Sequence, residues 1–268
     1  MKTLNLAVIG KDVSKSDSPA IHKFIAENTG NRINYKSVSV PENQFELKID
    51  GLLKEYDGFN ITIPYKISVI PHLKTISGDA LVFGAVNTVD THTKSGYNTD
   101  GLGFSLMLKT NGVEVQGKTA LVLGAGGAGR SVAKKLADAG AVVSIYDKNY
   151  KTCLAVADEF EGVIPIEKIS VRPYYLVVNA TGIGMHSTEG VSPADEELLK
   201  LCSVALDLIY VPAKSRFLEI AESLGKKIIN GAAMLFYQAY YSECIYFGTE
   251  PDETQAKELF KKYTEKNL

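Results

Sequence analysis

A glycine-rich loop between two apolar segments constrains this chain more than any other feature of its sequence. Residues 124–129 read GAGGAG, which matches the pattern G-x-G-x-x-G in full. The loop follows an apolar run at 119–123 and precedes a helical pattern, the context in which these glycines indicate a dinucleotide site. They permit a tight turn, a close approach of backbone to pyrophosphate and the packing of helix on strand, while the helix N-terminus offers N–H groups to phosphates. The expected cofactor-binding glycines are Gly124, Gly126, Gly127 and Gly129.

An acidic residue lies at the position where dinucleotide-binding sites contact the ribose of the cofactor. Asp147 follows the next apolar run, 142–146. A carboxylate at the end of the second strand accepts hydrogen bonds from the ribose hydroxyls of NAD and would repel the 2′-phosphate of NADP. Lys148 comes next, and its ammonium could pair with that phosphate, although as a flexible point charge rather than a planar fork. These two residues favour NAD, or the use of both cofactors.

The composition is that of a globular protein without a strong charge of either sign. The chain has 268 residues, 45% of them hydrophobic, which allows a substantial core in one large or two medium domains. A net charge of −2 gives no field that would draw the protein to nucleic acid or a membrane, and no apolar run approaches the roughly 20 residues of a membrane span. The three cysteines suggest neither a zinc site nor a disulfide framework, so we expect a cytoplasmic protein without a metal.

Apolar runs alternate with helical patterns throughout, which predicts an α/β fold of two domains with mostly parallel sheets. We place a Rossmann-type dinucleotide-binding domain at 112–230 and a substrate-binding, catalytic α/β domain at 1–111, to which the helices of 231–268 are expected to return. The first helix is expected to have Ser18 as its N-cap and Pro19 in its first turn. The expected strands are 4–9, 33–39, 58–62, 86–90, 119–123, 142–146, 176–179, 204–208 and 227–230.

Four polar clusters in the first domain differ from the apolar segments that pack in a core; they are 16–19, 60–66, 85–88 and 98–101. Each has a structural alternative, since Ser18 and Asp100 could be helix N-caps, Lys66 a solvated lysine and Asn87 a partner of buried backbone groups. Together they offer hydroxyls, amides, one ammonium and one carboxylate, which suits a small polyhydroxylated acid. They also suit hydride transfer from a cofactor, because a lysine beside an aspartate can donate a proton to the forming alkoxide.

The same clusters resemble, in order, the motifs of the shikimate dehydrogenase family over essentially the whole chain. The matches are the paired serines of 16–19, N-x-T-x-P-x-K at 60–66, A-V-N-T at 85–88, N-T-D-x-x-G at 98–103, the glycine loop, and segments 179–185, 207–212 and 231–239. The resemblance implies reversible, nicotinamide-dependent reduction of 3-dehydroshikimate to shikimate, a step of aromatic amino-acid biosynthesis.

The resemblance also implies a role for individual residues. Lys66 and Asp100 would be the catalytic pair, and Ser16 and Ser18 would hold the substrate carboxylate. The hydroxyls of the substrate would be bound by Thr62, Asn87 and Gln238, and the nicotinamide would be bordered by Tyr210, Gly231 and Met234. We expect a small-molecule substrate, no nucleic-acid or membrane partner, and a monomer or homodimer.

Several alternatives stay open at this point. The family often carries Asn-Arg-Thr after the second strand of the nucleotide domain, where this chain has Asp-Lys-Asn at 147–149, so NADP and NAD both remain candidates. A quinate or dual quinate/shikimate dehydrogenase is the nearest rival, although such enzymes tend to place threonine where Ser18 stands. A non-catalytic, nucleotide-responsive binding protein is the rival of another class, but it could lose Lys66 or Asp100 freely and both are present.

Overall fold

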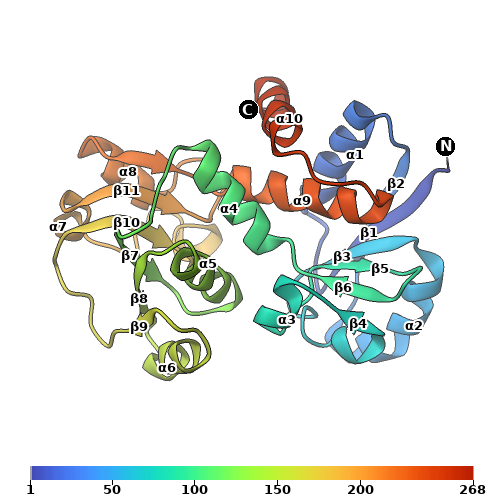
Figure 1. Cartoon of the computed structure of the whole chain (residues 1–268), viewed down its shortest axis with the longest axis horizontal. Coiled ribbons are helices and arrows are strands. Elements are labelled where there is room, and N and C mark those ends of the chain that lie inside the picture. Colours follow the sequence, from blue (N-terminus) through green and yellow to red (C-terminus); the bar gives the residue numbers. More distant parts are fainter. Residues whose placement is uncertain (1, 268) are drawn as a thin grey trace. The chain divides into compact units, whose positions relative to one another are not determined.

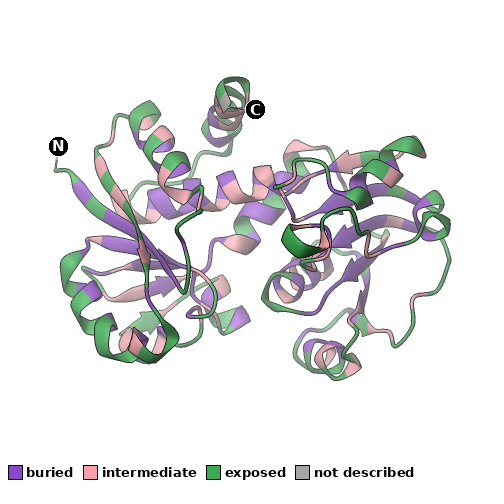
Figure 2. Ribbon diagram, turned by 180° about the vertical axis from the view of Figure 1, so that it is seen from behind, coloured by how far each residue is buried: buried purple, intermediate pink, exposed green. Residues whose placement is uncertain are grey.

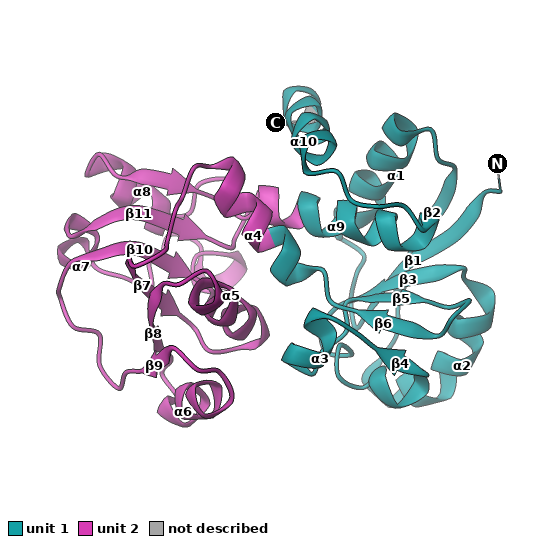
Figure 3. Cartoon of the chain, in the orientation of Figure 1, with its two compact units in different colours: residues 1–103, 236–268 teal, residues 104–235 magenta. Residues whose placement is uncertain are grey.

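The computed structural model describes residues 2–267, and the chain divides into two compact units, each with its own sheet (Figure 3). Unit 1 comprises residues 1–103 and 236–268, and unit 2 comprises residues 104–235. The borders fall in the first turns of α4 (Asp100–Thr110) and α9 (Ala232–Phe247), whereas we expected them after residue 111 and before residue 231. Met1 and Leu268, the outer limits of the expected domains, lie outside the described residues.

Unit 1 has a mixed six-stranded sheet with the order β2-β1-β3-β5-β6-β4. β1 pairs in parallel with β2 and β3, while β5 and β6 form an antiparallel hairpin beside β3. The strands are β1 (Leu4–Gly10), β2 (Ile33–Ser39), β3 (Gly58–Ile61), β4 (Thr75–Ile76), β5 (Thr88–Asp90) and β6 (Ser95–Tyr97). The prediction of parallel strands is confirmed for β1 to β3. It missed the hairpin, whose turn is held by Asp90 accepting hydrogen bonds from His92 N and Thr93 Oγ1.

Helices cover both faces of this sheet (Figure 1). On one face, Phe45 and Ile49 of α2 join a core with Ile9 of β1 and Phe59 of β3. On the other face α9 packs directly on β3, because a Cβ at Gly58 would lie 2.6 Å from the ring of Tyr246. The helices of this unit are α1 (Ser18–Thr29), α2 (Phe45–Glu55), α3 (Asp79–Phe83), most of α9 and α10 (Glu253–Asn267), with short 3-10 turns at Glu42–Gln44 and Ile70–His72.

Unit 2 has an all-parallel six-stranded sheet with the order β12-β11-β10-β7-β8-β9, which confirms the expected Rossmann-type class. Its strands are β7 (Thr119–Leu123), β8 (Val142–Tyr146), β9 (Val163–Pro165), β10 (Tyr174–Asn179), β11 (Cys202–Asp207) and β12 (Lys227–Ile229). Its helices are most of α4, α5 (Gly127–Asp138), α6 (Tyr150–Glu159), α7 (Glu196–Lys200) and α8 (Arg216–Ser223), with a 3-10 turn at His186–Thr188.

The buried residues of unit 2 concentrate on the central strands (Figure 2). The chain runs outward from β7 in one direction through β8 and β9, and in the other through β10 to β12. Ligands of such sheets bind at the carboxyl ends of the strands where this direction reverses. The glycine loop leaves β7 at that point. Among residues 2–267, no helix combines the length and the apolar character needed to cross a membrane.

Candidate active site

Three polar segments of unit 1 meet at the carboxyl ends of two neighbouring parallel strands. The loop after β1 and the loop after β3 run side by side, since Lys11 N donates to Ile63 O at 3.2 Å and Thr62 N to Ile9 O at 2.9 Å. The segment before β5 joins them, because Ile61 N donates to Asn87 O at 2.8 Å. The sheet therefore gathers the predicted segments 16–19, 60–66 and 85–88 at one edge.

Lys66 and Asp100 form an ion pair at this edge. Lys66 Nζ lies 2.6 Å from Asp100 Oδ2, and the two side chains are 29% and 20% exposed, so they are partly desolvated yet open to a small molecule. The Lys66 backbone is fixed by Val86 N, which donates to Lys66 O at 2.7 Å. Asp100 is the first residue of α4, where the helix dipole favours a carboxylate, and its own N–H donates to Asn98 Oδ1.

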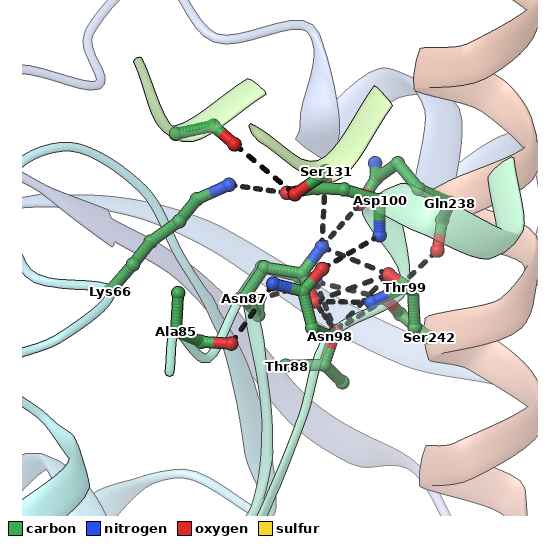
Figure 4. A network of polar contacts seen from close by, with 12 residues as sticks. Lys66, Ala85, Asn87, Thr88, Asn98, Thr99, Asp100, Ser131, Gln238 and Ser242 are labelled. Carbon is green, nitrogen blue, oxygen red and sulfur yellow. Dashed lines mark hydrogen bonds and ion pairs between the residues drawn. The ribbon is translucent and has the colours of Figure 1, made fainter. Parts of the chain in front are cut away.

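Asn87 holds the other oxygen of Asp100 (Figure 4). Asn87 Oδ1 accepts the backbone N–H of Thr99 at 2.9 Å, and because a backbone N–H can only donate, this contact fixes which end of the amide is oxygen. Asn87 Nδ2 therefore donates to Asp100 Oδ1 at 2.8 Å. The same nitrogen lies 3.5 Å from Gln238 Oε1 on α9. The structure thus brings four predicted site residues together: Lys66, Asn87, Asp100 and Gln238.

The paired serines stand at the start of α1, where Ser16 Oγ accepts the N–H of Ser18 at 3.3 Å, but neither is the N-cap residue. The N-cap residue is Asp17, which makes no side-chain capping hydrogen bond, and α1 begins at Ser18 itself, so the expectation of Ser18 as N-cap is wrong. Proline at the next position fits the first turn as expected. Ser16 Oγ donates to Ser18 Oγ at 3.1 Å, so the two half-buried hydroxyls point at each other. They are available as a neutral pair of hydrogen-bonding groups near a helix N-terminus.

Thr62 is oriented by its packing against the end of β1. A Cβ at Gly10 would lie only 2.5 Å from Thr62 Cγ2, so the glycine makes room for the threonine methyl. The methyl group therefore occupies the side facing β1. Thr62 is half-buried and follows β3 directly, on the same segment as Lys66.

The glycine loop of unit 2 has the geometry that a dinucleotide requires. Gly124 has φ +102°, a conformation that strongly favours glycine, and a Cβ at Gly129 would lie 2.0 Å from Gly124 O. Cβ atoms at Gly126 or Gly127 would meet nothing within 4 Å. The loop is thus closed where the helix packs on the strand and open at the N-terminus of α5, which leaves room for a pyrophosphate beside free N–H groups. These residues fit a dinucleotide cofactor.

Asp147 is tied to the glycine loop. Its Oδ2 accepts the N–H of Ala125 at 2.9 Å, and its Oδ1 accepts the N–H of Asn149 at 3.0 Å. The carboxylate therefore has a structural use besides any contact with a ribose. Lys148, the next residue, is exposed. Both residues lie at the carboxyl end of β8, beside the loop, as the sequence predicted.

A buried carboxylate shapes the segment that carries Tyr210. Asp207 Oδ1 accepts the N–H of Ile209 and an amide proton of Asn179, each at 3.0 Å, and Oδ2 accepts the hydroxyl of Ser215 at 2.5 Å. Burial raises the pKa of Asp207, and these three hydrogen bonds oppose the rise. Sequence reasoning gave Asp207 no role, because its partners at 179 and 215 are distant in the chain.

Gly231 packs closely against the segment that carries Tyr210. A Cβ at Gly231 would lie 2.0 Å from Leu208 O, so no side chain fits there. Its N–H donates to Ile209 O at 3.1 Å, which ties the start of α9 to the Tyr210 segment. Met234 lies one turn further along and is half-buried, as is Tyr210. All the expected cofactor-binding residues fall in unit 2, and all the expected catalytic and substrate-binding residues fall in unit 1. No group of three or more potential metal-ligating side chains occurs in the described part of the chain.

Comparison with known proteins agrees with this geometry. A family model described as the shikimate dehydrogenase substrate binding domain matches residues 8–89. A protein of Carboxydothermus hydrogenoformans named shikimate dehydrogenase (NADP(+)) is 38% identical over 91% of this chain and 91% of its own length. The chain belongs to the shikimate dehydrogenase family. Another relative with the same name, from Thermus thermophilus, is 36% identical over 97% of this chain and 98% of its own.

Solved structures of the family share the fold. Shikimate 5-dehydrogenase of Thermus thermophilus, in complex with NADP(H) and shikimate, has a TM-score of 0.87 and 35% identity and covers 97% of this chain and 99% of its own. A chorismate mutase/shikimate 5-dehydrogenase fusion protein of Clostridium acetobutylicum has a TM-score of 0.90 and 36% identity over 99% of both chains. Quinate dehydrogenase of Corynebacterium glutamicum, in complex with NAD, has a TM-score of 0.84 and 28% identity, and covers 97% of this chain and 99% of its own.

Proposed function

We propose that this protein catalyses the reversible, nicotinamide-dependent reduction of 3-dehydroshikimate to shikimate. The observation that carries the proposal is the ion pair of Lys66 and Asp100, held by Asn87 at the edge of the unit 1 sheet. That site has an ammonium able to donate a proton and an array of neutral hydroxyl and amide groups. The substrate class is inferred from the relatives named shikimate dehydrogenase.

Lys66 is the proton donor in the proposed reaction. The nicotinamide, when bound, supplies the hydride. The Lys66 ammonium gives a proton to the carbonyl oxygen of 3-dehydroshikimate as that oxygen becomes an alkoxide, and its positive charge stabilises the developing negative charge. Asp100 holds the ammonium in place through a hydrogen bond to its Oδ2, while Asn87 holds Oδ1. In the reverse direction the neutral amine of Lys66 accepts the hydroxyl proton of shikimate.

The remaining residues of unit 1 position the substrate. Ser16 and Ser18 donate hydrogen bonds to its carboxylate, for which their hydroxyls, 3.1 Å apart near the N-terminus of α1, form a neutral pair. The ring hydroxyls of the substrate are bound by Thr62, Asn87 and Gln238. In unit 2 the cofactor is held by the glycine loop, Asp147 and Lys148, and its nicotinamide is bordered by Tyr210, Gly231 and Met234. The three cysteines are free, which is consistent with a cytoplasmic protein, and we propose a monomer or homodimer.

We propose NADP as the main cofactor. Relatives at 38% and 36% identity carry NADP(+) in their names, which counts against the preference for NAD that Asp147 suggested. The structure offers a reason, because both oxygens of Asp147 already accept backbone N–H groups and are less available to a ribose. Replacing Asp147 by asparagine removes its negative charge, so we expect the ratio of kcat/KM for NADP to that for NAD to rise. A ratio that falls would show that this carboxylate does not oppose the 2′-phosphate.

The proposed function is tested by assaying the purified protein with shikimate and with quinate, each with NADP and NAD, through the ultraviolet absorbance of the reduced nicotinamide. Reduction of cofactor with shikimate and much less with quinate is the expected result. A protein that favours quinate would support the rival activity, for which a relative at 28% identity is the precedent. Absence of turnover with all four combinations would refute both.

A further inference from the structure

Asn60, at the end of β3, is a buried amide with every hydrogen-bonding position in use. It is 7% exposed. Its Oδ1 accepts the hydroxyls of Tyr35 at 2.7 Å and of Tyr246 at 3.1 Å. Its Nδ2 lies 3.1 Å from Ser242 Oγ, 3.2 Å from Thr88 Oγ1 and 3.2 Å from Asn87 O. This side chain therefore connects β2, β5 and α9 behind the ion pair.

The direction of these hydrogen bonds is fixed by a backbone group. Asn87 O is a carbonyl oxygen and can only accept, so the end of Asn60 that faces it must be the NH2 group. The oxygen of Asn60 must then face the two tyrosine hydroxyls, which donate to it. Burial raises the pKa of Tyr35 and of Tyr246 well above the ordinary value, so both hydroxyls keep their protons in the physiological range.

From Asn60 the donors run in one direction to the catalytic carboxylate. Asn60 Nδ2 donates to Thr88 Oγ1, and Thr88 Oγ1 donates to Asn87 Oδ1 at 2.8 Å. Asn87 Nδ2 donates to Asp100 Oδ1, while Lys66 donates to the other carboxylate oxygen. Thr88, Asn87 and Asp100 appear in this order in Figure 4. Hydrogen bonds arranged donor to acceptor along a chain polarise one another, and a carboxylate at the end gains most from them.

At the end of this series of hydrogen bonds that lies away from Asp100, Tyr35 packs against a buried pair, His22 and Glu243, that the proposed reaction does not use. The ring of Tyr35 stacks on His22 with centroids 4.4 Å apart and planes at 19°. His22 Nδ1 lies 2.6 Å from Glu243 Oε1, and both residues are almost fully buried. The stacked His22 ring thereby holds Tyr35 in place by one face of its ring.

We propose that Asn60 and Thr88 are positioning residues that act on the acid–base pair through Asn87: they keep its amide turned toward Asp100 and so keep Asp100 in place for Lys66. The role in catalysis rests on the proposed function, whereas the effect on the Asn87 amide does not. Asn60 donates to Thr88, and Thr88 donates to Asn87. Both act through Asn87.

Two substitutions of Thr88 separate the effect on stability from the effect on the orientation of Asn87. Thr88→Val keeps the volume and loses the hydroxyl, and Thr88→Ser keeps the hydroxyl and loses a methyl. Thr88→Val removes the hydrogen bond that Thr88 accepts from Asn60 and the one that it donates to Asn87, which should lower kcat about tenfold with KM for shikimate little changed. Thr88→Ser should keep kcat within about twofold of the wild type, since the chain of donors is intact, while its Tm falls because a buried methyl is lost.

Thr91→Val is the matched control. Thr91 is also a buried threonine, and its hydroxyl donates to Tyr56 O at 2.6 Å, but it lies outside the series of donors that leads to Asp100. It should lose stability without losing kcat. Tyr35→Phe, which keeps the ring on His22 and removes one donor to Asn60, serves as a second variant and should lower kcat less than Thr88→Val.

A measurement without substrate separates this proposal from the proposed function. In NMR spectra of the free protein, the side-chain amide protons of Asn87 should exchange with solvent more slowly in the wild type and in Thr88→Ser than in Thr88→Val. If Thr88→Val keeps both the slow exchange and the full kcat, or if Thr91→Val loses as much kcat, the positioning role is refuted. If the wild type reduces no cofactor with shikimate but the exchange pattern holds, the proposed function fails and the structural part of this proposal stands.

Discussion

Individual side chains in the proposed site are oriented by backbone groups that can only donate or only accept a hydrogen bond. The N–H of Thr99 fixes the oxygen of Asn87, and the carbonyl of Asn87 fixes the NH2 group of Asn60. Sequence motifs identified Asn87 as a candidate, but they gave no role to Asn60, Thr88 or Ser242. Their contacts join residues up to 186 positions apart in the chain, and such separations leave no local pattern in a single sequence.

Lys66 is the residue whose loss tests the proposed chemistry most directly. Lys66→Ala should lower kcat about 100-fold or more, the usual scale for a positioned acid–base group, while KM for shikimate changes much less. Because Lys66 and Asp100 act as one unit, Asp100→Asn added to Lys66→Ala should cost less than the product of the two single effects. A Lys66→Ala enzyme with more than half the wild-type kcat would remove Lys66 from its proposed role.

The two serines are expected to act on substrate affinity rather than on folding. Ser16→Ala and Ser18→Ala should each raise KM for shikimate, since a hydrogen bond to a charged group contributes about 1.5 to 3 kcal/mol. The Tm should change little in Ser18→Ala, because this hydroxyl does not cap α1. Ser14→Ala is the control in the same loop, as Ser14 is exposed and bonds only Asp12. Calorimetry that gives unchanged shikimate affinity in the double alanine variant of 16 and 18 would contradict the assignment.

At the scale of a single element, the glycines of the loop meet two different requirements, close packing against the backbone and open space for the cofactor. The pattern G-x-G-x-x-G does not distinguish them. Gly129→Ala would place a Cβ 2.0 Å from a backbone oxygen, which cannot move aside, so this variant should lose stability and cofactor binding together. Gly126→Ala has open space around its Cβ and should keep its Tm within a degree or two of the wild type. It should nevertheless bind NADP more weakly, because that space is where a pyrophosphate approaches the loop. Equal loss of stability in both variants would contradict this division.

The elements that were predictable are those with a strong local pattern. Most of the parallel strands of both sheets are apolar runs bounded by glycine and polar clusters and were predicted, whereas the two- and three-residue strands β4 and β9 were missed. The helix after the glycine loop begins where its pattern begins. The β5–β6 hairpin was missed although β5 lies in the expected strand 86–90, because β6 has three residues, too few for a period, and because the turn depends on the side chain of Asp90. Ser18 was misjudged because serine before proline is a common N-cap signal, whereas here the helix begins one residue earlier than that signal implies.

At the scale of the whole molecule, the candidate residues are divided cleanly between the two units. Every proposed catalytic and substrate-binding residue belongs to unit 1, and every proposed cofactor-binding residue belongs to unit 2. Each unit has its own sheet and its own buried core. A ligand stabilises the part of a protein that it binds, by an amount set by its concentration relative to its dissociation constant.

Hydrogen exchange should therefore report the two ligands in separate parts of the chain. With shikimate alone, backbone amides of 61–66 and 87–100 should become better protected, because local opening of unit 1 then costs additional free energy. With NADP alone, protection should rise at 124–131 and 146–149 instead. The Ser16→Ala, Ser18→Ala double variant should lose the first effect and keep the second, and Gly126→Ala should do the reverse. Protection of 124–131 by shikimate alone, equal to that produced by NADP, would show that the substrate is bound by residues of unit 2 and would overturn the assignment of the substrate site to unit 1.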